Sequence, residues 1–313
     1  MRHIAHKLPK SGSRTAFIVG AGRSGTTLLY KLLCLHPGVG FISNYDNRLS
    51  GRAPALMQRL FRHAYGAKLA AWFGRSGAAY MVRRRALMKL VPSPVEGEQL
   101  FRACGISRAA GADGAIAPAA LAELRRRLER IGAGAGTPVT LCKRTAINRF
   151  IGPLDAAMPG SRYIHLIRDG RDVANSLSRV DWWNRHVVWW DGRTAGEMEK
   201  AGEPRLAVCA RNWVAEVESI QRGLACVDAT RVLEIHYEDL LERPMPVLGN
   251  VLGFLGLELG HEMSAAVAAL ALRRRSPGGP SGWSERDRSL VNSEAAPLLA
   301  QFGYVETGEV ESS

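Results

Sequence analysis

Residues 17–33, with the sequence FIVGAGRSGTTLLYKLL, constrain the fold more than any other stretch of the chain. A short apolar run leads into a loop with three glycines, and apolar residues at helical spacing follow. A buried strand that turns through such a loop into a helix directs backbone N–H groups, and the positive end of the helix dipole, at an anion. The pattern therefore predicts a phosphate-binding loop at the end of a strand.

Strands and helices alternate along the rest of the chain. Strands are expected at 15–20, 40–43, 137–143, 161–168 and 230–237, and helices at 25–35, 118–131, 146–158, 204–226, 244–256 and 285–302, with the glycine run at 132–136 ending the second helix. This order predicts a three-layer α/β fold with a mainly parallel sheet. We interpret residues 1–313 as one domain, in which a basic helical segment at about 50–132 is an insertion over the ligand site.

The charge balance indicates an anionic partner. Lysine and arginine number 42 against 29 acidic residues, which gives a formal charge of +13. A phosphorylated cofactor, a nucleic acid and a membrane surface are all compatible with this charge. It does not identify the fold.

The cysteines and the hydropathy pattern favour a cytoplasmic protein. The five cysteines are widely spaced, without a CxxC pair or a histidine cluster, so we expect reduced thiols and no metal site. The basic N-terminus lacks the apolar core of a secretory signal, and no apolar run approaches the ~18–20 residues that span a bilayer.

Three ligand classes compete for the glycine loop. Gly20, Gly22 and Gly25 match the dinucleotide pattern G-x-G-x-x-G, with Asp46 at the distance of a ribose-binding acid. The loop also matches the P-loop GxxxxGK[ST], except that Thr26 replaces the lysine that reaches the β- and γ-phosphates of a triphosphate. A glycine turn without a ligand is disfavoured, because packing alone would not need the small polar residues.

The third class is a donor with only two 5′ anionic groups, which needs no lysine at position 26. Backbone N–H groups of residues 23–27 and the hydroxyls of Ser24, Thr26 and Thr27 would hold it, and Arg23 would add fixed charge. A 5′-phosphosulfate has this form.

Two motifs resemble the sulfotransferases that use 3′-phosphoadenosine-5′-phosphosulfate (PAPS). GAGRSGTTLL resembles their 5′-phosphosulfate loop, which lacks the P-loop lysine and carries lysine or arginine where Arg23 stands. YIHLIRDGRDVANSLS, residues 163–178, resembles the motif in which an arginine and a serine eight residues later hold the 3′-phosphate; these are Arg168 and Ser176. The planar fork of arginine suits phosphate. For Arg168 alone, an ion pair with Asp169 or Asp172 is the structural alternative.

The resemblance extends over most of the chain and is greatest to the bacterial branch of the family. The strand before the second motif carries Lys143, residues 235–244 resemble a tyrosine-glutamate-aspartate-leucine segment, and residues 273–290 resemble a basic C-terminal loop that closes on the donor. Trp283 is the clearest match in that loop, whereas Arg273, Arg274 and Arg275 stay unassigned. Gly22 and Gly25 count among the donor-binding residues.

The resemblance implies in-line transfer of a sulfuryl group to a hydroxyl or amine, without a metal, and 3′,5′-adenosine bisphosphate (PAP) as product. We assign Arg23 to the leaving phosphate and the sulfuryl group, and Lys143 to assist it, with a solvated strand-end lysine as the alternative. Thr145 stands where one branch has a catalytic histidine. Other branches use glutamate, so Glu96 is the first candidate base and Asp46 the second, with solvated surface acids as the alternative for both.

The acceptor is not identified by the sequence. WWNRHVVWW, residues 182–190, is interpreted as the acceptor side, for a carbohydrate, an aromatic alcohol or a lipid-linked acceptor, with core packing as the alternative. The basic helices at 53–90 are interpreted as a solvated or donor-facing surface, with peripheral contact to an anionic membrane as the alternative. The oligomeric state stays open.

Two rival classes are weaker. A P-loop kinase acting on a small molecule would need a lysine in place of Thr26 and an acidic Mg²⁺ ligand at a strand end, where Arg168 stands. A nucleic-acid binder would interleave aromatic and basic residues over an extended face, whereas the aromatic residues here cluster in one segment. We therefore expect no nucleic-acid partner.

Overall fold

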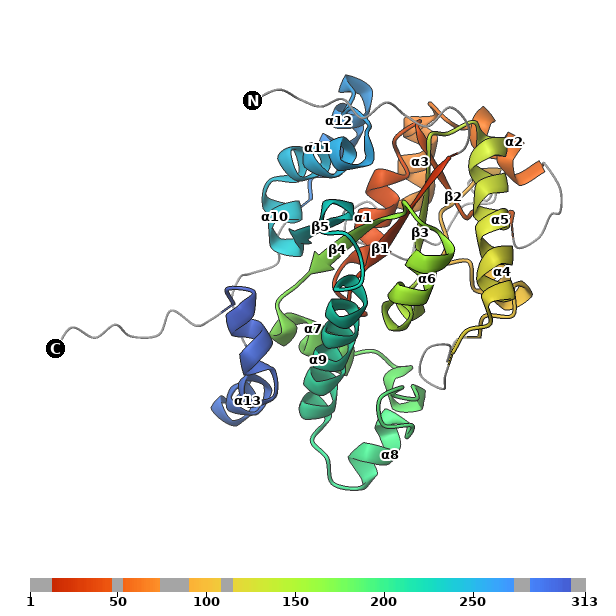
Figure 1. Ribbon diagram of the computed structural model, residues 1–313. Helices are drawn as coiled ribbons and strands as arrows, with labels where there is room; N and C mark the ends of the chain where they lie inside the picture. Colours follow the sequence, from red (N-terminus) through yellow and green to blue (C-terminus); the bar gives the residue numbers. More distant parts are fainter. Residues whose placement is uncertain (1–12, 47–52, 74–89, 108–114, 273–281, 305–313) are drawn as a thin grey trace.

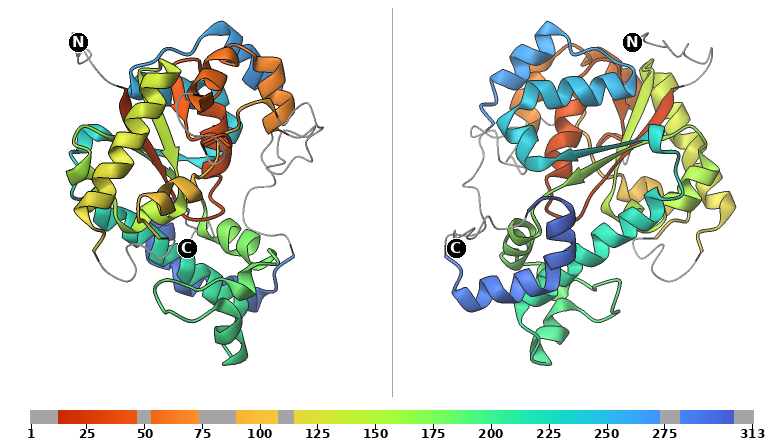
Figure 2. Two further views of the ribbon diagram at one scale, coloured as in Figure 1. Left: turned by 90° about the vertical axis from the view of Figure 1, so that its right-hand side faces the viewer. Right: turned by 60° about the vertical axis from the view of Figure 1, so that its left-hand side comes forward.

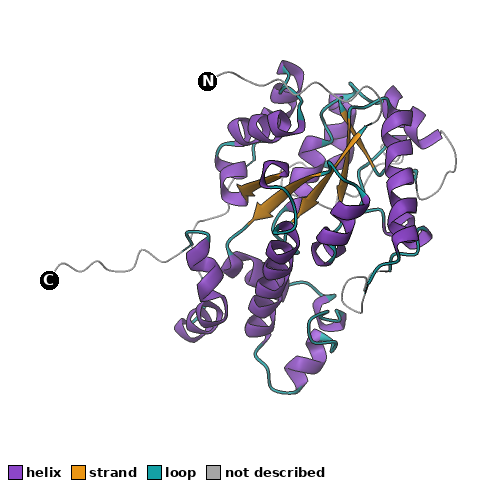
Figure 3. Cartoon of the chain, in the orientation of Figure 1, coloured by secondary structure: helices purple, strands orange, loops and turns teal. Residues whose placement is uncertain are grey.

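The computed structural model describes residues 13–46, 53–73, 90–107, 115–272 and 282–304. Its centre is a five-stranded sheet in the order β2-β3-β1-β4-β5 (Figures 1 and 3). All neighbouring strands are parallel. The strands are β1 (Arg14–Val19), β2 (Val39–Phe41), β3 (Val139–Lys143), β4 (Arg162–Ile167) and β5 (Val232–His236). The predicted α/β class and parallel sheet are confirmed.

The middle strand, β1, determines where a ligand site forms. It pairs with β3, where Ile18 lies opposite Lys143, and with β4, where Val19 lies opposite His165. The chain leaves β1 toward one side of the sheet and later returns to the other side. In open α/β sheets, ligands bind beyond the carboxyl ends of the strands at such a reversal. The glycine loop, Lys143 and Arg168 all lie at this edge.

Helices connect the strands and cover the sheet. In chain order they are α1 (Thr26–Leu33), α2 (Ala53–Leu60), α3 (Tyr65–Trp72), α4 (Glu98–Ala103), α5 (Pro118–Ala135), α6 (Ile151–Ala157), α7 (Gly170–Ser178), α8 (Ala195–Lys200), α9 (Arg205–Leu224), α10 (Tyr237–Glu242), α11 (Pro244–Leu255), α12 (His261–Ala268) and α13 (Glu285–Gln301). Short 3₁₀ turns are η2 (Thr145–Arg149), η3 (Trp183–Arg185) and η4 (Ala229–Arg231).

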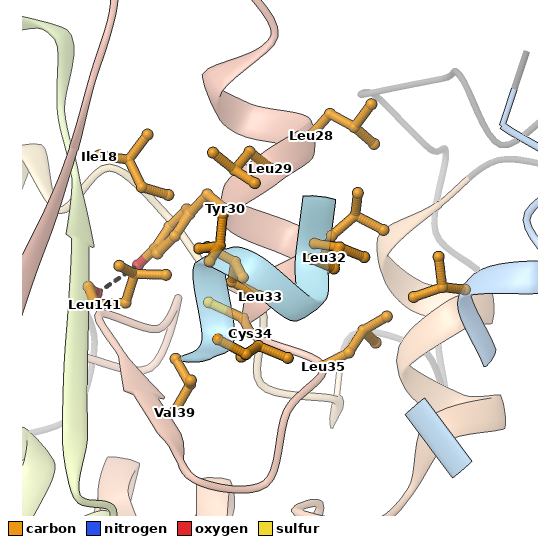
Figure 4. Close-up of a cluster of buried hydrophobic side chains, with 14 of the residues drawn as sticks. Ile18, Leu28, Leu29, Tyr30, Leu32, Leu33, Cys34, Leu35, Val39 and Leu141 are labelled. Carbon is orange, nitrogen blue, oxygen red and sulfur yellow. Dashed lines mark hydrogen bonds between the residues drawn. The ribbon is translucent and has the colours of Figure 1, made fainter. Parts of the chain in front are cut away.

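Alternating side chains of β1 divide the core into two layers. Ala16 and Ile18 pack with α1, α3, α11 and α12 on one face, whereas Phe17 and Val19 pack with α4, α5, α6 and α9 on the other. Figure 2 shows the sheet between these two sets of helices. In the first layer, the Tyr30 hydroxyl donates to the carbonyl of Leu141 at 3.4 Å, which joins α1 to β3 (Figure 4). The expected three layers are present.

The segment between β2 and β3 contributes to both layers. Trp72 of α3 lies in the first layer and donates through Nε1 to the carbonyl of Pro92 at 2.9 Å. Leu121, Leu124 and Leu128 of α5 lie in the second. Residues 74–89 of the predicted basic helices lie outside the described residues. The single-domain boundaries and the insertion at about 50–132 remain predictions.

Helix α5 is longer than expected, because it continues through the glycine run to Ala135. A Cβ at Gly132 would lie 2.2 Å from Oγ1 of Thr140, so a glycine is needed where the last turn meets β3. The helix ends at Gly136, whose φ of 63° is the left-handed conformation that favours glycine. The prediction that the run ends the helix is therefore confirmed, but the last helical residue is Ala135 and not residue 131 as expected.

The cysteines of the described residues are free thiols. Cys34, Cys104, Cys142 and Cys209 are buried free thiols, and Cys226 is an exposed one. Within the described ranges, every helix is too short or too polar to span a lipid bilayer.

Candidate functional site

The glycine loop, residues 20–25, joins β1 to α1 and is closely packed at both ends. A Cβ at Gly20 would lie 2.7 Å from the carbonyl oxygen of Leu166, and a Cβ at Gly25 would lie 2.3 Å from the ring of Tyr237. Gly25 also has a φ of 89°. Gly22 differs, since no described atom lies within 4 Å of its Cβ position. Packing explains why glycine is needed at positions 20 and 25, whereas at Gly22 the lack of a side chain leaves the backbone open to a ligand.

The N-terminus of α1 is arranged to receive an anion. Gly25 is its N-cap and has no side chain that could accept a hydrogen bond. The first N–H groups of the helix are therefore directed into the loop without a side-chain acceptor. Ser24 is 1% exposed, and its hydroxyl has no hydrogen-bond partner among the residues that the structure describes. A buried hydroxyl is normally paired, and a bound anion would supply the partner.

Arg168 follows β4 and lies against the loop. Its guanidinium lies over the ring of Tyr237, 4.5 Å from the centroid, and its NH1 group donates to the carbonyl of Arg23 at 3.0 Å. Its NH2 group is 3.4 Å from Oδ2 of Asp172, while its buried Nε is without a partner in the described part of the chain. The ion pair with Asp172 therefore exists but leaves donor capacity on Arg168.

Arg23 bridges the two predicted motifs. Its φ is 75°, and its Nε donates to Oγ of Ser176 at 3.0 Å. The sequence assigned Arg23 to the 5′ end of the donor and Ser176 to the 3′-phosphate. The structure brings these two side chains together, although the sequence had assigned them to opposite ends of the donor.

The second motif is fixed by the C-terminal part of the chain. Asp169 caps α7 by accepting from the backbone N–H of Arg171 at 2.9 Å, and it also pairs with the Arg171 guanidinium at 2.8 Å. Arg171 donates in turn to the carbonyl of Tyr304 at 2.9 Å. Asp169 thus pairs with Arg171 and not with Arg168, which frees Arg168 for the loop.

Lys143 ends β3 and is directed at the first turn of α1. It is 4% exposed, and its Nζ donates to Oγ1 of Thr27 at 3.3 Å and to Oε1 of Glu96 at 2.5 Å. The alternative of a solvated strand-end lysine was wrong, because the ammonium is buried at the expected place. Thr26 is also buried, at 4% exposure.

Glu96 comes to Lys143 from the segment that follows the proline break. The backbone N–H of Val95 donates to the carbonyl of Ile42 at 2.9 Å, which aligns this segment with the end of β2. Gly97 then turns the chain with a φ of 70°. The Glu96 side chain remains 49% exposed, so one carboxylate contacts both the buried lysine and the solvent.

Asp46 has a different environment. Its Oδ2 accepts from the backbone N–H of Ser43 at 2.7 Å and from the Ser43 hydroxyl at 2.5 Å. Burial raises the pKa of Asp46, and the bonds from Ser43 partly offset that effect. Its described hydrogen bonds hold its own turn, which distinguishes it from Glu96.

Trp283 packs beneath the second motif. It is 9% exposed and shares a hydrophobic cluster with Ala174 and Leu177 of α7 and with Val291 of α13. Arg273, Arg274 and Arg275, which the sequence left unassigned, lie outside the described residues. The donor contact predicted for Trp283 stays a prediction.

The aromatic segment 182–190 combines packing and exposure. Trp183 and Val188 are fully buried beside α7, α8 and α9, so core packing accounts for them. Trp183 also stacks on His186, with ring centroids 5.3 Å apart. Trp182 and Val187 are exposed by 46% and 52%. An acceptor could therefore contact only part of the segment.

Three residues of the site were not predicted as such from the sequence. Tyr237 contacts both Gly25 and Arg168, although its segment was matched only as a whole. Asn148 pairs with both backbone groups of Gly20, and Glu216 accepts from Asn148. No local pattern marks these residues, because each acts across a large sequence separation.

The described residues contain no metal-binding cluster beside the glycine loop, and two hollows that they line lie at the other end of the sheet. Among them, no group of three or more His, Cys, Asp or Glu side chains is arranged to hold a metal ion. Two hollows that share His36 lie at the amino ends of the strands, opposite the glycine loop. His36 itself accepts from the backbone N–H of Gly38 at 2.9 Å and contacts the carbonyl of Glu258 at 3.0 Å, which is a structural role.

The fold of the chain resembles that of solved sulfotransferase structures. The sulfotransferase STF1 from Mycobacterium tuberculosis H37Rv superposes with a TM-score of 0.60 at 18% identity, over 92% of this chain and 78% of that one. STF9 from Mycobacterium avium gives 0.57 at 13% identity, over 93% and 77%. The sulfotransferase domain from the curacin biosynthetic pathway gives 0.50 at 17% identity, over 95% and 99%. At these identities the likeness shows the fold.

Sequence comparison shows the family. No curated protein sequence matches the chain. The model of the sulfotransferase family matches residues 16–261, which contain the glycine loop, Lys143, Arg168 and Ser176. The chain therefore belongs to the sulfotransferase family and is an enzyme of sulfuryl transfer.

Proposed function

We propose that this sulfotransferase uses PAPS as donor and releases PAP, and that the acceptor is a hydroxyl or amine. The observation that carries the proposal is the contact between the two motifs. Arg23 of the glycine loop donates to Ser176, and Arg168 donates to the backbone of Arg23. A donor with anionic groups at both 3′ and 5′ positions would lie along this joined surface, whereas NAD lacks the 3′-phosphate.

The residues at the loop fit the two ends of such a donor. The unpaired Ser24 hydroxyl and the uncapped N-terminus of α1 suit the 5′-phosphosulfate. The buried Nε of Arg168 and the Ser176 hydroxyl suit the 3′-phosphate. Trp283 supports the helix that carries Ser176. The surplus of positive charge in the chain agrees with this polyanion.

The chemistry supplied by PAPS is an activated sulfuryl group on a phosphate leaving group. The acceptor oxygen would form the new S–O bond as the bond from sulfur to the leaving phosphate oxygen breaks, and the charge that gathers there would be balanced by Lys143 and Arg23. Lys143 is positioned for this role through its bond to Thr27. Glu96, with a half-exposed carboxylate, would take the acceptor proton. Asp46 is the weaker candidate, since it is bonded to its own turn.

The acceptor side is proposed at the exposed part of the aromatic segment. Trp182 and Val187 offer apolar surface for a carbohydrate ring, an aromatic alcohol or a lipid-linked acceptor. We place the enzyme in the cytoplasm, where the buried thiols would stay reduced. The kinase alternative is not favoured, because Thr26 cannot replace the P-loop lysine.

Ligand binding tests the donor directly. PAP, 5′-AMP, ATP with Mg²⁺ and NADPH are titrated into the protein and followed by calorimetry and thermal shift, with Arg168→Ala and the exposed Arg179→Ala as variant and control. We expect strong binding of PAP and weaker binding of 5′-AMP. Arg168→Ala should lose about 1.5–3 kcal/mol of PAP binding, the range for a charge-assisted bond. Equal or better binding of ATP or NADPH by the wild type would overturn the donor assignment.

A further inference from the structure

A buried hydrogen-bond chain connects the aromatic segment to the glycine loop. Nε1 of Trp189 donates to Oε1 of Glu216 at 2.8 Å, and Nδ2 of Asn148 donates to Oε2 of the same carboxyl group at 2.6 Å. Asn148 also donates to the carbonyl of Gly20 at 3.0 Å and accepts from its backbone N–H at 3.3 Å. Gly20 is the first residue of the loop, so the chain runs from the acceptor side to the donor side.

The chain has only one consistent arrangement. Gly20 presents one N–H and one carbonyl, and these fix which end of the Asn148 amide is oxygen and which is nitrogen. The second N–H of Asn148 then needs an acceptor, and Glu216 provides it. The other oxygen of Glu216 receives the indole N–H of Trp189. Each oxygen of the carboxyl group thus accepts from a different part of the site.

The environment of Glu216 indicates a specific role for the acid. It is 7% exposed in the middle of α9, where a carboxylic acid is costly without partners. Burial raises its pKa, and the bond from Asn148 and the nearby charge of Arg149 partly offset this. Arg149 also lies over the Trp189 ring, 5.8 Å from the centroid. An apolar residue would serve packing alone, so the acid is explained by the two bonds.

Gly20 is where a small shift would matter most. Its Cβ position lies 2.7 Å from the carbonyl oxygen of Leu166 and 2.8 Å from the Thr26 side chain, so the backbone there fits between β4 and α1. Thr26 in turn begins the helix whose N–H groups face the donor. A change at Asn148 would therefore be transmitted to the 5′ end of the donor site.

We propose that Glu216 is a positioning residue that couples Trp189 on the acceptor side to the glycine loop on the donor side. Through Asn148 it holds Gly20 in the conformation that receives the 5′-phosphate. The position of Trp189 then determines how tightly that phosphate is bound. This inference rests on the proposed PAPS site, and it assigns a function to residues that do not contact the donor.

Two tryptophan variants provide a matched test. Trp189→Phe removes the N–H that reaches Glu216 and keeps an aromatic ring. Trp190→Phe makes the same change at the next residue, whose Nε1 donates to Asn212 on α9 at 3.3 Å and not to the chain to Gly20. The affinities of PAP and of 3′-AMP are measured by calorimetry for both variants and the wild type. Their ratio isolates the contribution of the 5′-phosphate.

We expect Trp189→Phe to reduce that ratio on the order of three- to tenfold, in the range of coupling within one hydrogen-bond network. Trp190→Phe should leave the ratio unchanged. In the double variant Trp189→Phe with Glu216→Gln, the loss should be smaller than the product of the two single losses. General damage to the fold would weaken both ligands and leave the ratio intact.

The outcomes separate the two proposals. Equal ratios for Trp189→Phe, Trp190→Phe and the wild type would overturn the coupling while the donor site stands. Absence of PAP binding by the wild type would instead overturn the donor assignment, and the coupling with it.

Discussion

Nε of Arg23 donates to the hydroxyl of Ser176 at 3.0 Å, across 153 residues of sequence. One residue belongs to the glycine loop after β1, and the other to helix α7 after β4. Parallel neighbours in a sheet bring such segments to the same edge. The contact joins two motifs that the sequence could only place in order along the chain.

Removal of the Ser176 hydroxyl should weaken the 3′ end of the donor site. Ser176→Ala deletes the partner of Arg23 and a proposed ligand of the 3′-phosphate. We expect PAP to bind more weakly by about 1 kcal/mol, the net value of one hydrogen bond, and 5′-AMP to bind as before. Calorimetric titration of both nucleotides measures the difference.

The control for this variant is Ser178→Ala in the same helix. The Ser178 hydroxyl donates to the carbonyl of Asn175 at 2.9 Å, which is a bond within the helix. Ser178→Ala therefore shows how far a loss of helix stability alone affects PAP binding. PAP binding should be unaffected. If both serine variants weaken PAP equally, Ser176 has no direct role.

Alanine substitutions at Gly25 and Gly22 should have different effects, because Gly25 is packed against Tyr237 and Gly22 faces open space. Gly25→Ala places a Cβ 2.3 Å from the Tyr237 ring at a φ of 89°, so the backbone strain and the clash add. We expect a loss of stability of about 2 kcal/mol or more. Urea unfolding measures it.

Gly22→Ala is the matched variant, since no described atom lies within 4 Å of its Cβ position. Its stability should stay within about 1 kcal/mol of the wild type. PAP binding should nevertheless fall, because the methyl group would occupy space that the donor approaches. Unchanged PAP affinity in Gly22→Ala would argue against a close approach of the ligand at this glycine.

Much of the fold could be predicted from the sequence, because the periodicities that mark strands and helices are local. It also placed the glycine loop, Lys143 and Arg168 at strand ends, where the structure has them. It ranked Glu96 first and Asp46 second as candidate bases, but it could not show which of the two carboxyl groups lies beside Lys143. Only the structure shows that Glu96 contacts Lys143 while Asp46 accepts from Ser43.

The same limit applies to residues that act through distant partners. Glu216 reads as one more residue of an amphipathic helix, and its bonds to Asn148 and Trp189 depend on tertiary packing. The sequence also placed the last residue of α5 too early, at 131 instead of Ala135, because glycine ends a free helix but allows a packed helix to approach a strand closely.

Substitution of the two candidate bases should distinguish them. Glu96→Gln keeps an oxygen toward Lys143 but cannot take a proton, so turnover should fall by roughly 10²–10⁴, the usual contribution of a general base. Asp46→Asn keeps an oxygen that can accept both Ser43 bonds, so turnover should change little. The assay follows PAP release with an acceptor chosen from a panel of carbohydrates and aromatic alcohols.

Glu98→Gln is the control for Glu96. Glu98 lies two residues along and pairs with Arg144 at 2.9 Å, away from Lys143. Its turnover should stay within a few-fold of the wild type. PAP affinity should be retained in all three variants. A loss of turnover confined to Asp46→Asn would instead identify Asp46 as the base.

Lys68 should make the stability of the protein depend on pH in the alkaline range. The side chain is 4% exposed, and its Nζ donates to the carbonyls of Leu35 at 3.3 Å and Arg62 at 2.8 Å, which joins α3 to the ends of α1 and α2. Burial lowers the pKa of Lys68 from 10.5 to about 8. Between these values the unfolded chain holds a proton that the folded protein has released, so stability rises with pH through this window.

The change is isolated by comparison with Lys68→Met, which lacks the titrating group. The free energy of unfolding of the wild type relative to this variant should increase between pH 7 and pH 10.5, on the order of 3 kcal/mol. The exposed Lys200→Met supplies the baseline for all other titrations. Urea unfolding at several pH values measures the three proteins. If the difference between wild type and Lys68→Met stayed constant, or decreased, as pH rose, the ammonium would not be destabilised by burial, and its two carbonyl bonds would have to offset the loss of water fully.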